Sequence, residues 1–182
     1  MPPSAEQAAQ ALRDIAAINA RAAGFQDYQA ESNQLILWGG MHVVAFVLTA
    51  LFPTFALFIW VPLILLATAG GCLLAVRAAP HVQGIVWRYL VLIGSILLFH
   101  VLINTIMWPV SAQQATLVAP LLVCTLYVFR GVHLRPRYLL IGVLVATLCL
   151  FGYAFFSAFF WWWMAFAYGG IFVLFGLWLR RA

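Results

Sequence analysis

The chain has 182 residues, of which 66% are hydrophobic and 7% are charged, and its formal net charge at pH 7 is +5. A soluble domain has roughly half apolar and a quarter charged residues, and one of this size could not bury so much apolar surface. The composition therefore excludes an ordinary soluble domain and predicts that lipid surrounds most of the chain.

The first 31 residues differ from the rest, because they contain all four carboxylates of the chain and only two of its nine arginines. Ser4 and Gln7 have the spacing of a capping box, which predicts the start of a helix. Apolar residues then recur on one face of that helix, as in an amphipathic helix. They are Ala8, Ala11, Leu12, Ile15, Ile18 and Ala22.

We expect residues 1–31 to form a cytoplasmic amphipathic domain of their own. A membrane-surface helix is usually rich in Lys or Arg, whereas this segment is acidic overall. Its Ala-rich face suits packing against another helix. Residues 4–23 are therefore a candidate surface for binding a second copy or a protein partner, with membrane binding as an alternative.

Residues 32–182 contain six apolar segments of about 17–23 residues, the length that spans a bilayer core roughly 30 Å thick. Because every backbone polar group must be paired inside the lipid, we expect six transmembrane helices. The fold class is thus an all-α integral membrane bundle. The segments are Leu35–Leu51, Thr54–Val76, Tyr89–Trp108, Ala112–Phe129, Tyr138–Phe156 and Phe159–Leu179.

The arginines of this part fall in alternate gaps between the segments, while the turns near Pro53, Pro109 and Ser157 carry no charge. Since Arg-rich loops stay in the cytoplasm, this pattern predicts three hairpins that point outward and two cytoplasmic termini. We expect a multi-pass protein of the inner (plasma) membrane whose basic rim faces anionic lipids. The rim comprises Arg77, Arg88, Arg130, Arg135, Arg137, Arg180 and Arg181.

Several functions are excluded or disfavoured by what the sequence lacks. There is no Asp or Glu after Glu31, so proton relays and cation sites built on carboxylates are excluded from the membrane part. Cys72, Cys124 and Cys149 lack a CxxC spacing, which argues against a disulfide or metal cage. No basic stripe with interleaved aromatics indicates nucleic-acid binding. An enzyme is less favoured because no nucleophile–base pair is recognisable.

Three polar residues are expected near the bilayer midplane: His42, His100 and Asn104. Asn104 follows His100 by four residues, so the two share a helix face. A buried imidazole in hydrocarbon requires a partner. Three interpretations remain open: hydrogen bonds that hold helices together, a pocket for a small ligand, or a b-type haem bound by His42 and His100.

Two further segments have a structural interpretation. Ser111–Gln114 opens the fourth apolar segment and is expected to cap its helix. Trp161–Trp163 opens the sixth and is expected to anchor it at the membrane interface.

The leading hypothesis for function is a small polytopic membrane protein that transports or binds a small ligand through His42, His100 and Asn104. The first alternative is a structural or regulatory protein that binds itself or a partner through the N-terminal helix. The second alternative is the bis-His haem protein. A homo-oligomer is compatible with each of them.

Overall fold

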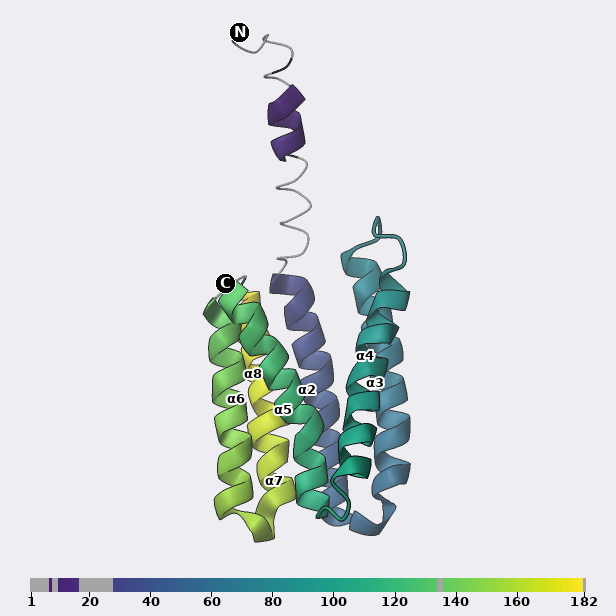
Figure 1. The fold of residues 1–182 in the computed structure, drawn as a ribbon, viewed down its shortest axis with the longest axis vertical. Helices are drawn as coiled ribbons and strands as arrows, with labels where there is room; N and C mark the ends of the chain where they lie inside the picture. Colours follow the sequence, from purple (N-terminus) through teal and green to yellow (C-terminus); the bar gives the residue numbers. More distant parts are fainter. Residues whose placement is uncertain (1–6, 8–9, 17–27, 134–135, 182) are drawn as a thin grey trace.

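The computed structural model describes residues 7, 10–16, 28–133 and 136–181 of the chain. Within these residues the protein is helical and has no strand. Six helical segments are long and apolar enough to cross a membrane, as expected from the sequence. Figure 1 shows them side by side, roughly along one axis.

The elements follow one another with short connections, and one of them, η3, is a π-helix. In chain order they are α2 (Tyr28–Leu51), η1 (Pro53–Phe55), α3 (Ala56–Ala78), α4 (Ile85–Ile106), α5 (Ala112–His133), α6 (Pro136–Phe155), η2 (Ser157–Phe159), α7 (Phe160–Met164), η3 (Ala165–Gly170) and α8 (Ile171–Arg180). The last four form a single membrane-length segment, Ser157–Arg180. Helix α2 begins before the predicted Leu35, so it runs through the expected domain boundary after residue 31.

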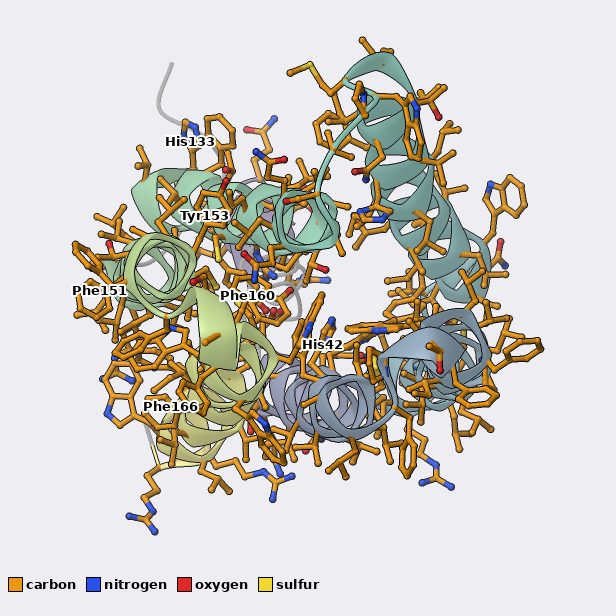
Figure 2. All side chains as sticks on the ribbon, turned by 90° about the horizontal axis from the view of Figure 1, so that it is seen from below. His42, His133, Phe151, Tyr153, Phe160 and Phe166 are labelled. Carbon is orange, nitrogen blue, oxygen red and sulfur yellow. The ribbon has the colours of Figure 1, made fainter. Side chains whose placement is uncertain are left out.

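The helices are arranged as a ring when viewed along the bundle (Figure 2). Helix α2 packs against α3 on one side and against α7, η3 and α8 on the other, so the first and last membrane segments are neighbours. Helix α5 packs against α6, and α4 lies between α3 and α5. The end of α3, the start of α4, the end of α5, the start of α6 and the end of α8 lie together at one end of the bundle (top in Figure 1). Each of these helix ends carries an arginine, so we call it the arginine end.

Glycines let two of these helix pairs approach closely. A methyl group at Gly169 would lie 2.6 Å from the backbone nitrogen of Val43, and one at Gly142 would lie 2.6 Å from the carbonyl oxygen of Cys124. Small residues at such contacts bring backbones together, and van der Waals packing of this kind drives helix association in lipid. These glycines therefore explain why α2 meets η3 and α5 meets α6 so closely.

Most of the buried core lies between α2, α5, α6 and the last segment. Phe46, Ile141, Val145, Phe160 and Met164 are fully buried there. Every residue of helix α4 is described, and none of them is buried. The bundle thus consists of a well-packed part and a more exposed α3–α4 pair.

The N-terminal segment is described only at residues 7 and 10–16, which are helical and exposed. Leu12 is 67% exposed and Ile15 is 54% exposed. Figure 1 shows this short helix (purple) beyond the arginine end, apart from α2–α8. The other residues of the proposed amphipathic helix and of the 4–23 surface lie outside the described part of the chain.

Candidate functional site

A cleft between α4 and α5 contains two of the three polar residues singled out above. His100 and Asn104 lie one turn apart near the C-terminal end of α4, the end away from Arg88, and line an open cleft of about 770 Å³. Val101 and Thr105 of α4, Trp108 and Val110 of the connection, and Ala112 and Ala115 of α5 complete the lining. The volume is typical of small-molecule sites.

His100 and Asn104 interact with each other. The Asn104 amide nitrogen donates a hydrogen bond to the His100 carbonyl oxygen at 2.8 Å and lies 3.4 Å from His100 Nε2. The other two polar atoms of the pair, His100 Nδ1 and Asn104 Oδ1, are buried and have no hydrogen-bond partner. Buried polar groups are nearly always paired, so two orphaned atoms beside one cleft are unusual.

His42 occupies a different environment and does not line this cleft. Its Nδ1 donates to the Trp38 carbonyl oxygen at 2.7 Å, because a carbonyl can only accept. Its ring lies 4.7 Å from the ring of Tyr168 and 5.6 Å from that of Trp60, measured between centroids. Figure 2 shows His42 turned from α2 into the space that the helices enclose.

The predicted set is therefore divided between two places. The structure brings His100 and Asn104 together on α4, whereas His42 belongs to an aromatic cluster between α2, α3 and η3. Haem ligation by His42 and His100 stays a prediction. It would require His100 to present one of its two ring nitrogens to the haem iron. Nε2 faces the Asn104 amide, and Nδ1 is buried.

A second polar site, which sequence reasoning missed, lies at the arginine end. Glu31 on α2 forms a 2.8 Å ion pair with Arg130 on α5 and accepts a 2.6 Å hydrogen bond from the Tyr127 hydroxyl. The Arg130 guanidinium also lies 4.7 Å from the ring centroid of Tyr138 on α6. The available signal was Glu31 itself, as the last carboxylate before a membrane segment, and the i, i+3 spacing of Tyr127 and Arg130.

A third group of hydrogen bonds joins α2, α3 and α4. The Trp38 indole donates to the Tyr89 hydroxyl at 2.7 Å, and that hydroxyl donates to Gln34 Oε1 at 3.0 Å. The Gln34 amide nitrogen donates to the Gly71 carbonyl oxygen at 2.9 Å. These bonds join the three helices in the half of the bundle nearer the arginine end.

The other arginines of the basic rim have varied surroundings. Arg180 donates to Asn33 Oδ1 at 2.6 Å and to the Ser32 hydroxyl at 3.2 Å. The Arg137 guanidinium lies 5.1 Å from the ring centroid of Trp178. Arg77, Arg88 and Arg181 are exposed, and Arg135 lies outside the described residues.

The two remaining expectations concern the end of the bundle that holds the cleft. Ser111 and Gln114 form a reciprocal capping box at the start of α5, with bonds of 3.2 and 2.9 Å between backbone nitrogens and side-chain oxygens, which confirms the expected cap. Trp163 donates its indole N–H to the Leu148 carbonyl oxygen at 2.8 Å. The predicted anchoring role of Trp161–Trp163 in the lipid interface stays a prediction.

Comparison with known proteins gives no relative: no family model matches the chain, and neither a curated protein nor a solved structure matches it.

Proposed function

We propose that this protein is a small polytopic membrane protein that binds a small ligand in the α4–α5 cleft, in a transport or binding role. The observation that carries the proposal is the pair of buried, unpartnered atoms, His100 Nδ1 and Asn104 Oδ1, beside a cleft of ligand size. An unpaired buried polar group is unfavourable by about 1–3 kcal/mol. A ligand that pairs both atoms would recover that free energy on binding.

The proposed setting follows the charge pattern. The membrane would be the inner (plasma) membrane, with both termini in the cytoplasm and three hairpins pointing outward. The arginine end would then face anionic lipid headgroups, and the cleft would open in the outer half of the bilayer. A ligand could reach it from outside the cell or from the outer leaflet.

Native mass spectrometry of gently extracted protein tests the ligand site. We expect the wild type to retain a small molecule and the His100→Leu/Asn104→Leu variant to lose it. Ser95→Ala is the matched control, because Ser95 lies on α4, donates to the Val91 carbonyl oxygen of the same helix and does not line the cleft.

Thermal unfolding of the same proteins serves as the control for correct folding. The double variant removes both members of the His100–Asn104 contact together with the two unpaired atoms, so its melting temperature should stay close to that of the wild type. Equal occupancy of wild type and double variant by the same molecule would refute the site.

A second candidate function is binding of a second copy through the N-terminal helix, which the exposure of Leu12 and Ile15 favours. In this case Leu12→Asp/Ile15→Asp should lower the molecular mass of the detergent-solubilised particle, measured by light scattering. Gln10→Ala/Asp14→Ala changes the polar side of the same described turns and is the control. An unchanged mass in the first variant would exclude this mode of association.

A further inference from the structure

The hydrogen bonds of Asn104 fix which way its amide points. A carbonyl oxygen only accepts hydrogen bonds, so the group that lies 2.8 Å from the His100 carbonyl oxygen must be the amide nitrogen. The amide oxygen Oδ1 therefore points elsewhere, and it is the buried atom without a partner. Position 104 thus offers an acceptor.

The same contact favours one tautomer of the His100 ring. The Asn104 amide nitrogen lies 3.4 Å from Nε2 and has no lone pair with which to accept a proton. A hydrogen on Nε2 would point at the amide hydrogens, so Nε2 carries the lone pair. In the neutral ring the hydrogen is then on Nδ1, which is the second buried atom without a partner. Position 100 thus offers a donor.

From this pair we infer that the cleft takes an uncharged molecule whose polar end carries both a hydrogen-bond acceptor and a donor, such as an amide, a urea or an alcohol. The inference rests on the proposed function, since it names the ligand class of the same cleft. The acceptor would pair with His100 Nδ1–H and the donor with Asn104 Oδ1.

The rest of the lining agrees with an uncharged ligand. The cleft has no arginine and no carboxylate among its lining residues, so a charged molecule would lose hydration without gaining a counter-charge. A cation cannot accept from Nδ1–H, and a carboxylate cannot donate to Oδ1. Val101, Val110 and Ala115 provide an apolar wall for the remainder of the ligand, and the largely exposed Trp108 provides a ring surface.

Binding requires the two side chains to turn, because both unpartnered atoms are buried. The terminal torsions of Asn and His are broad, so the proposed binding includes a turn of both side chains that brings Nδ1 and Oδ1 to the cleft. This turn exchanges the Asn104 bond to the His100 carbonyl for bonds to the ligand. The His100 ring is therefore a direct reporter of occupancy.

The test uses four small aromatic probes that differ in their polar groups: benzamide, benzyl alcohol, benzoate and benzylammonium. The full-length protein carries ¹⁵N-histidine and is held in lipid nanodiscs at pH 7.5. The readout is the ¹⁵N signal of His100, assigned with His100→Gln. We expect Nδ1 to carry the hydrogen, and benzamide and benzyl alcohol to shift its signal in a saturable way.

Variants of position 104 separate ligand recognition from general partitioning into lipid. Asn104→Leu keeps the His100 reporter and should weaken benzamide binding at least tenfold, while Ser95→Ala should not change it. Asn104→Asp replaces the amide by a carboxylate and should gain benzylammonium binding, a result that misfolding cannot produce.

The outcomes separate this inference from the proposed function. If benzoate or benzylammonium binds best to the wild type and depends on position 104, the uncharged class is wrong and the site stands. If no probe shifts the His100 signal, the class is also overturned. If, in addition, the protein carries no molecule dependent on His100 and Asn104 in native mass spectrometry, the proposed function fails with it.

Discussion

At the scale of single residues, Gly71 decides whether three helices can share one set of hydrogen bonds. The Tyr89 side chain lies directly over Gly71, where a methyl group would overlap the hydroxyl and ring carbons of Tyr89. Tyr89 in turn bonds to Trp38 and Gln34 on α2. The missing side chain on α3 therefore lets α4 reach α2.

We expect Gly71→Ala to lower the free energy of unfolding by about 1–3 kcal/mol, because overpacking would push Tyr89 away from its partners. Gly70→Ala is the matched control. Its new methyl would meet only Leu37 side-chain atoms, at 3.4 Å and beyond, so its stability should be unchanged or slightly raised. Thermal unfolding in detergent measures both.

A double-mutant cycle identifies the cause. In a Tyr89→Ala background the obstruction is absent, so Gly71→Ala should be nearly neutral there. An equal loss with and without Tyr89 would place the effect in α3 itself rather than in the contact with α4.

At the scale of helices, the ion pair of Glu31 and Arg130 joins the start of α2 to the end of α5. The side chain of Glu31 is 16% exposed and that of Arg130 is 37% exposed, so the pair is only partly screened by solvent. Removing Arg130 leaves Glu31 without its ion-pair partner. Removing Glu31 leaves both Arg130 and the Tyr127 hydroxyl without the carboxylate that they contact.

Glu31→Leu and Arg130→Met should each destabilise the protein, by about 1–3 kcal/mol, because an unpaired charge remains near the helix ends. The double variant should lose less than the sum of the two, since no unpaired charge is left. Arg88→Met serves as a control, because Arg88 is exposed and its loss should have little effect. Strict additivity of the two single changes would show that the pair contributes nothing.

The sequence predicted the helices better than their partners. Six spans follow from apolar length alone, and the shared face of His100 and Asn104 follows from their spacing of four. The partners of Glu31 could not be predicted, because Tyr127 and Arg130 lie 96 and 99 residues further along the chain. His42 is a similar case, since its aromatic neighbours Trp60 and Tyr168 come from other membrane segments.

At the scale of the whole molecule, the charged side chains of the described bundle, residues 28–133 and 136–181, gather at one end. Ion pairing and the hydrogen bonds of Tyr89 and Arg180 hold the arginine end together. The other end holds the cleft beside α4, the helix without a buried residue. Hydrogen bonds between helices also occur in this half, such as that from Gln113 of α5 to the Ser157 carbonyl oxygen, so the opening there is confined to the cleft between α4 and α5.

The arginine distribution also makes the orientation testable. Arginines near short loops are retained in the cytoplasm, so the connection between α3 and α4 should lie inside and that between α4 and α5 outside. Gln83 and Met107 are exposed residues of these two connections. In intact cells, a membrane-impermeant maleimide should label Met107→Cys and should reach Gln83→Cys only after permeabilisation.

The unsubstituted protein provides the background for this labelling, because Cys124 and Cys149 are buried and Cys72 lies within α3. Two further variants repeat the comparison at the next two connections. Ser157→Cys should be labelled in intact cells, as Met107→Cys is, and His133→Cys only after permeabilisation, as Gln83→Cys is. Labelling of Gln83→Cys in intact cells would reverse the orientation and place the cleft in the cytoplasmic half of the bilayer. Since the cleft residues stay the same in either case, this experiment decides from which side the proposed ligand would arrive.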